Sequence, residues 1–121
     1  MVKDTIERDM EIENCPIRNI LDRVGDKWSV LIISMLADEP RRFNELKRMI
    51  GDITQRVLTS TLRKLEADGL ISRHVEPSSP PKVTYALTDL GRDLLETLKP
   101  LIIWAKDNFD DILLSRSQFE G

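Results

Sequence analysis

Apolar and polar positions follow the period of an amphipathic helix through the first half of the chain. Four segments carry apolar residues at spacings of three and four, and each is bounded by a proline, a glycine or a capping side chain. Asp26 and Thr54 are suited to cap the second and fourth segments, and Gly51 and Gly69 to end the third and fourth. The pattern predicts helices over residues 16–24, 27–37, 43–50 and 55–68.

The same spacing predicts which side of each helix faces the core. In the third helix the inward positions are Phe43, Leu46, Met49 and Ile50. In the fourth helix they are Val57, Leu58, Leu62 and Leu65. The opposite face of the fourth helix is left polar.

After Gly69 the period changes from helical to alternating. Residues 71–76 and 83–87 flank a turn rich in proline and serine at 77–81, which predicts a β-hairpin. Thr88 can cap a final helical region, and Pro100 is expected to kink or divide it.

This order of elements predicts a fold that is mainly α-helical with a small β-hairpin. Helices joined by a tight connection and followed by a hairpin indicate a winged helix-turn-helix. We expect one domain over residues 15–121, preceded by an acidic segment over residues 1–14.

Composition limits the class of protein. The chain has 121 residues, of which 40% are hydrophobic and 32% charged, as in one folded domain. No uncharged apolar run approaches the roughly 18 residues of a spanning helix, and residues 1–14 are too acidic for a signal peptide. We therefore expect a cytoplasmic protein with no membrane partner.

The chain offers few groups for metal binding or catalysis. One cysteine and one histidine can form neither an internal disulfide nor a Cys/His zinc site, so we expect no metal and no cofactor. An enzyme would need Cys15 and His74 as a thiol–imidazole pair, and no catalytic motif surrounds either residue. We predict that the chain is not an enzyme.

The net charge of −3 hides an uneven distribution. Residues 41–75 carry eight basic side chains against four acidic ones, and the flanking segments are acidic. A localised basic stretch is what a phosphate-binding face would show, although a solvated surface gives the same count.

The polar face of the fourth helix carries side chains of the types that contact DNA bases and phosphates. Gln pairs with adenine and Arg with guanine in the major groove, and hydroxyl groups of Thr and Ser bond phosphates. The candidate base-reading residues are Thr54, Gln55, Arg56, Thr59, Ser60 and Arg63.

A second group of residues is suited to hold the DNA backbone. Near the hairpin, or wing, they are Arg73, Ser78, Ser79 and Lys82. Before and within the third helix they are Arg41, Arg42, Lys47 and Arg48, of which at least one is expected to pair with Glu45 or Asp52 instead.

Several blocks of the sequence resemble the HxlR-type winged helix-turn-helix regulators of bacteria. These blocks are GDKW, RRFNEL, ITQRVLTSTLRKLEADGLISR, PPKVTYALTDLGR and the downstream Trp104, in the family's order and spacing between Cys15 and about Trp104. The resemblance implies a homodimeric regulator of transcription that binds double-stranded DNA at a pseudo-palindromic operator. We expect repression, because a compact dimer acts most simply by occlusion.

The final helix carries more apolar side chains than a domain of this size needs. Such a stripe suggests a partner face, with packing onto the first helix as the alternative. The candidate dimer residues are Leu94, Leu98, Leu101, Ile102, Trp104 and Ile112.

Two questions stay open at the level of sequence. In HxlR-type proteins a cysteine at the position of Cys15 resembles the one that several members use to sense oxidants or electrophiles, yet a free cysteine is often a buried packing residue. A winged helix that contacts only another protein is the alternative to specific DNA binding. The small-molecule or oxidant effector, if any, is not identified by these residues.

Overall fold

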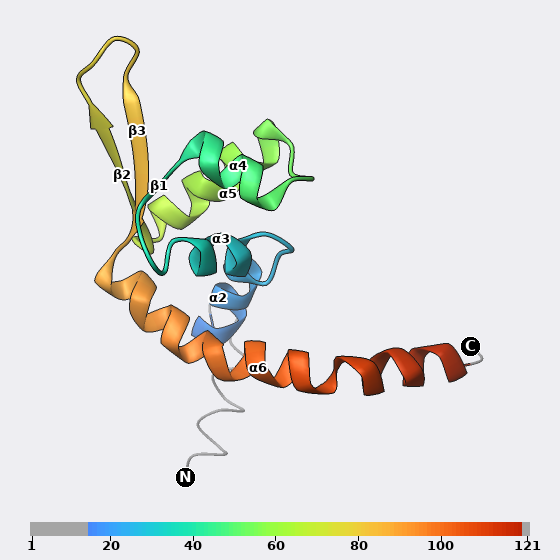
Figure 1. The fold of residues 1–121 in the computed structure, drawn as a ribbon. Coiled ribbons are helices and arrows are strands. Elements are labelled where there is room, and N and C mark those ends of the chain that lie inside the picture. The colour runs from blue at the N-terminus through green and yellow to red at the C-terminus, as the bar shows by residue number, and fades with distance from the viewer. Residues whose placement is uncertain (1–14, 120–121) are drawn as a thin grey trace.

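Four short helices, a small sheet and one long terminal helix follow one another in a computed structural model that describes residues 15–119 (Figure 1). The elements are α2 (Pro16–Val24), α3 (Ser29–Met35), β1 (Arg41–Arg42), α4 (Phe43–Ile50), α5 (Gln55–Ala67), β2 (Ile71–Glu76), β3 (Lys82–Leu87) and α6 (Asp89–Gln118). The acidic segment expected over residues 1–14 lies outside the described residues. The fold is the predicted one, mainly helical with a small sheet.

Side-chain caps fix where three of the helices begin. Asp26 accepts hydrogen bonds from the backbone N–H groups of Trp28 (2.8 Å) and Ser29 (2.7 Å), and α3 begins at Ser29 rather than at the predicted residue 27. Thr54 accepts from the N–H of Val57 (3.1 Å) at the start of α5. Thr88 accepts from the N–H of Gly91 (3.0 Å) at the start of α6, as predicted.

The hairpin is part of a three-stranded antiparallel sheet. Strand order is β1-β3-β2, with Arg41 opposite Tyr85 and Ile71 opposite Leu87. The sequence predicted residues 41–42 only as an extended link. They pair with β3 because its outer edge would otherwise leave backbone N–H and C=O groups without partners.

The core lies between the inner face of α5 and the helices that precede it. Leu58, Leu62 and Leu65 are fully buried on α5, as predicted. They belong to one apolar cluster with side chains from α3, α4 and the sheet, among them Ile32, Ile33, Leu36, Leu46 and Ile71. This cluster determines which side of α5 is turned to solvent.

Two residues predicted to face the core are exposed instead. Val57 keeps 38% and Met49 44% of its surface accessible. Both lie at the edge of the apolar stripe of their helix, where the neighbouring helices do not cover them. The prediction was wrong because helical spacing gives the centre of a buried face and not its width.

Helix α6 is continuous from Asp89 to Gln118 with Pro100 inside it. It bends along its length in Figure 1 but is not divided, because a proline removes one backbone hydrogen bond and leaves the rest of the helix paired. Its second half extends away from the body of the molecule (Figure 1). None of the helices within residues 15–119 combines the length and apolar character needed to cross a bilayer.

The close approach of α6 to the connection between α5 and β2 depends on Gly91. A Cβ atom at this position would lie 2.0 Å from the carbonyl oxygen of Leu70, which is backbone and cannot rotate away. We predict that Gly91→Ala lowers the free energy of unfolding by about 2 kcal/mol, although alanine is the better helix former. Urea denaturation measures this, with the exposed Ser115→Ala as control; an unchanged Gly91→Ala variant would contradict the packing described.

Candidate nucleic-acid interface

The solvent face of α5 carries the predicted base-reading residues together. Gln55, Arg56, Ser60 and Arg63 are exposed and Thr59 is half-buried. Thr54 is exposed at the cap, where its oxygen accepts a hydrogen bond and its hydroxyl proton stays available to a phosphate. The buried leucines on the opposite side hold this face outward.

The wing lies beside one edge of this face. Arg73 on β2 and Thr59, Arg63 and Glu66 on α5 line the same hollow, of about 260 Å³. Nearer the tip, Lys82 shares a second groove with Arg42 and Asn44 at the start of α4. Cations therefore flank the space between α5, α4 and the wing.

The two serines at the wing tip differ. The hydroxyl of Ser78 donates to the carbonyl oxygen of Pro80 at 2.7 Å, so its proton is engaged within the turn. Ser79 is exposed and lines the groove beside α4. Ser79 is the better placed of the two to donate to a phosphate.

Arg41 differs from the other predicted backbone clamps because it bonds within the fold. Its side chain is only 19% exposed, and it donates to Glu39 (2.8 Å) and to the carbonyl oxygen of Met35 (3.2 Å). It also lies 3.8 Å from Glu45, the pairing expected from the sequence. Arg42 and Arg48 are exposed and Lys47 is half-buried.

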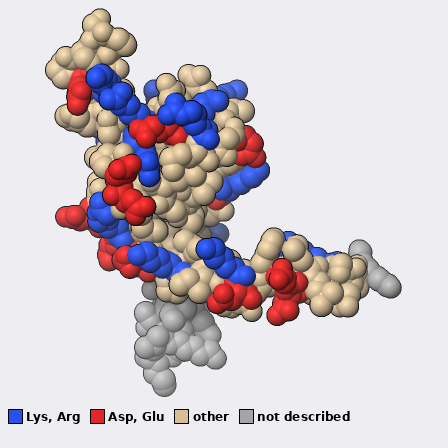
Figure 2. Space-filling view, in the orientation of Figure 1, with Lys and Arg blue, Asp and Glu red and all other residues tan. Residues whose placement is uncertain are grey.

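Basic side chains are spread over the wing and the α4–α5 part of the molecule, with acidic side chains between them (Figure 2). On the face that Figure 2 shows, the cations are separate from one another rather than one continuous patch. Such a set suits contacts to individual phosphates along a backbone.

A groove on the other side of α5 was missed by the sequence analysis. It lies between α5 and the turn before α3, and Trp28, Arg56, Ser60 and Lys64 line it. Lys27 lies over the Trp28 ring, with its ammonium 4.8 Å from the ring centre. The spacing of Ser60 and Lys64 on one helix edge was a usable signal, but only the fold brings Trp28 beside them.

Asp26 lines the same groove, and its carboxylate accepts hydrogen bonds from neighbouring groups of the protein. Burial raises the pKa of this carboxyl, but hydrogen bonds from the Ser29 N–H, the Ser29 hydroxyl and the Trp28 N–H outweigh that effect and hold the pKa below its usual range. Asp26 therefore stays ionised at neutral pH, and the groove holds its one negative charge beside the positive charges of Arg56 and Lys64.

Comparison with known proteins identifies the family. The family model described as HxlR-like helix-turn-helix matches residues 23–112. The chain belongs to this family of transcriptional regulators. Among curated relatives, the HTH-type transcriptional regulator YdeP of Bacillus subtilis is 45% identical over 97 residues, which cover 80% of this chain and 73% of that protein.

Solved structures of similar proteins share the fold. The putative transcriptional regulator ytfH of Salmonella typhimurium superposes with a TM-score of 0.79 at 36% identity, covering 88% of this chain and 96% of that one. The redox regulator HypR in its reduced form gives a TM-score of 0.76 at 42% identity, covering 83% and 98%. The HxlR-type resemblance of the sequence is thus confirmed.

The Asp26 cap predicts a pH-dependent contribution to stability. We expect Asp26→Ala to lower the free energy of unfolding by about 1 kcal/mol at pH 7. Because the folded pKa is lowered, this contribution is present above the unfolded value of about 3.9 and is lost as pH falls through the folded pKa.

The measurement is urea denaturation of the wild type and Asp26→Ala between pH 7 and pH 3. The exposed Asp22→Ala is the control and should show a smaller difference from wild type. A difference for Asp26→Ala that grows on acidification would contradict the assigned role.

Proposed function

We propose that the protein is a sequence-specific regulator that binds double-stranded DNA with α5 in the major groove. The observation that carries the proposal is the outward face of α5, where Gln55, Arg56, Ser60 and Arg63 are grouped and exposed. The groove admits one helix, and these side chains match its donor and acceptor pattern. We expect the protein to act in the cytoplasm, where it would encounter double-stranded DNA.

The cations on both sides of α5 support contacts to two DNA strands. On one side Arg73, Lys82 and Ser79 of the wing line hollows beside α5 and α4, the latter together with Arg42. Arg48 lines a separate hollow on α4 with Lys47. On the other side Lys64 and Lys27 border the groove beside Trp28. A helix inserted in the major groove has a phosphate backbone along each edge, so the two sets serve different strands.

We infer a homodimer held by α2 and α6. The α6 stripe keeps Leu101 at 59% and Trp104 at 55% exposure, with Leu94, Leu98, Ile102 and Ile112 half-buried beside them. On α2, Ile17 and Leu21 are exposed as well. Apolar surface of this extent favours a second copy, and a two-fold dimer would place half-sites about 34 Å apart on a pseudo-palindromic operator.

Occlusion of a promoter by this dimer is the simplest mode of action, so we propose repression. The alternative is a winged helix that meets an acidic protein through the same cations. The salt dependence separates the two, because binding to DNA releases condensed counterions and gives a steep slope.

Fluorescence anisotropy tests the function directly. The protein is titrated at about 150 mM salt onto a duplex from its own upstream region and onto a scrambled duplex. We expect a preference of roughly a thousandfold or more for the upstream duplex. Equal weak binding to both, with a shallow salt slope, would favour the protein-contact alternative.

Two variants separate base reading from backbone contact. Arg63→Ala should reduce the preference for the operator by about 1–3 kcal/mol, whereas Lys82→Gln should weaken both duplexes equally and lower the salt slope by about one. Lys99→Gln, on α6 and paired with Glu96 at 2.7 Å, is the control and should change neither. An Arg63→Ala variant with intact preference would remove α5 from base reading.

A response to oxidants or electrophiles through Cys15 is a further part of the proposal. It is supported by the similarity to the redox regulator HypR and by the place of Cys15 at the start of α2, in the proposed dimer region. The thiol is fully buried, so reaction requires the first turn of α2 to open.

In a dimer, diamide would take two electrons and two protons from two Cys15 thiols and leave one disulfide across the interface. A mixed disulfide or alkylation are the other products open to a single cysteine. We predict that Cys15→Ser binds DNA as tightly as wild type and loses any change in anisotropy on adding diamide. A diamide response preserved in Cys15→Ser would show that Cys15 is a packing residue.

A further inference from the structure

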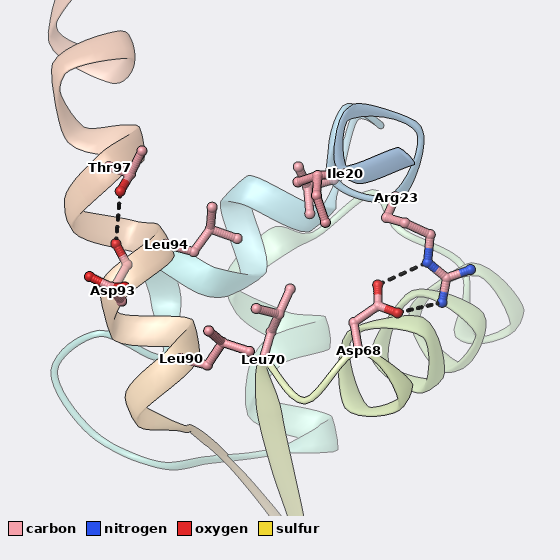
Figure 3. Close-up of a pocket in the computed structure, with 9 residues that line it drawn as sticks. Ile20, Arg23, Asp68, Leu70, Leu90, Asp93, Leu94 and Thr97 are labelled. Carbon is pink, nitrogen blue, oxygen red and sulfur yellow. Dashed lines mark hydrogen bonds and ion pairs between the residues drawn. The ribbon is translucent and has the colours of Figure 1, made fainter. Parts of the chain in front are cut away.

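An apolar pocket lies where α2, the end of α5 and α6 meet. Its volume is about 270 Å³, and Figure 3 shows its side chains converging from these elements. The apolar part of the wall is formed by Ile20, Val24, Leu70, Leu90 and Leu94. None of the residues assigned above to DNA contact lines it.

One edge of the pocket is an ion pair between α2 and the C-terminal cap of α5. Arg23 donates to Asp68 through Nε (2.8 Å) and Nη2 (3.1 Å), and both side chains are partly exposed. Each carboxylate oxygen of Asp68 keeps a lone pair beyond the one that Arg23 uses. The Thr97 hydroxyl is engaged with the carbonyl oxygen of Asp93 at 3.1 Å, so it is not free to donate (Figure 3).

We propose that this pocket binds a small neutral aromatic molecule of one or two rings that carries one hydrogen-bond donor, of the phenol or indole class. An apolar cavity of about 150 Å³ accommodates benzene, so the larger volume here suits up to two fused rings. The Asp68 carboxylate accepts the N–H or O–H of the ligand. The wall carries Asp68 and Asp93 against one cation, Arg23, so its net charge is negative and disfavours an anionic ligand.

The position of Asp68 couples the pocket to α5. Asp68 is the C-terminal cap of α5, and Arg23 Nη2 also lies 3.5 Å from the carbonyl oxygen of Lys64 in the last turn. A ligand that donates to a remaining lone pair of Asp68 draws on the same negative charge that holds Arg23. It therefore weakens the Arg23–Asp68 pair and loosens the attachment of α5 to α2. Occupancy therefore weakens DNA binding, and DNA weakens ligand binding by the same factor.

The binding part of the proposal is independent of the proposed function, and only the coupling rests on it. Binding is measured by 19F NMR with 5-fluoroindole and with 5-fluoro-1-methylindole, which lacks the donor. Leu90→Trp fills the pocket from α6, where Leu90 is 57% exposed. Leu114→Trp makes the same change at a residue 58% exposed on the distant half of α6 and is the matched control.

We expect wild type and Leu114→Trp to bind 5-fluoroindole at least fivefold more tightly than the methylated probe, and Leu90→Trp to lose this binding. Both variants should keep the far-UV circular dichroism and melting temperature of wild type, since both positions are exposed. Equal binding by Leu90→Trp, or equal affinity for the two probes, would overturn the proposal.

A third outcome would also overturn the ligand proposal. If wild type binds neither probe and Leu90→Trp changes the sedimentation coefficient, the pocket is part of a contact between two copies of the chain. For the coupling, saturating 5-fluoroindole should weaken operator binding about fivefold or more in wild type and not in Leu90→Trp. Ligand binding without this change in operator affinity would overturn the coupling alone. If the chain binds no DNA, the proposed function and the coupling fail together, and the 19F NMR result alone decides whether the pocket binds the ligand.

Discussion

The packing of the inner face of α5 is the constraint on which the rest of the structure depends. Leu58, Leu62 and Leu65 are fully buried in the common core, so the helix cannot rotate about its axis without exposing them. Fully burying a leucine contributes about 2 kcal/mol, and three of them outweigh any single polar contact on the outer face. The reading face is outward because the leucine face is inward.

The two ends of α5 are held by different interactions. Thr54 caps its first turn, and Asp68 at its C-terminal cap is tied to Arg23 of α2. The first end faces the proposed DNA and the second borders the pocket beside α6. One rigid helix thereby connects the surface proposed to read DNA with the region proposed to form the dimer and to take a ligand.

Local signals predicted much of this fold. The bounds of α2, α4 and β2 agree with the structure because prolines, glycines and changes of period mark them in the sequence. The grouping of Gln55, Arg56 and Arg63 on one face also follows from helical spacing alone. These features depend on residues within a few positions of one another.

Features that depend on distant segments were not predictable in the same way. The pairing of residues 41–42 with β3, the commitment of Arg41 to Met35 and Glu39, and the exposure of Val57 all follow from what the rest of the fold covers. The groove beside Trp28 and the pocket at Arg23 and Asp68 join residues roughly thirty to forty-five positions apart in the chain. A single sequence carries no signal for such contacts.

Dimethyl sulfate footprinting on the operator duplex tests the central claim most directly, because the reagent reports guanine N7 in the major groove and adenine N3 in the minor groove. With α5 in the major groove of each half-site, guanine N7 atoms should be protected in two groups about one helical turn apart. Arg63→Ala should lose part of that protection. Tight binding with adenine N3 protected and every guanine N7 still reactive would contradict the account.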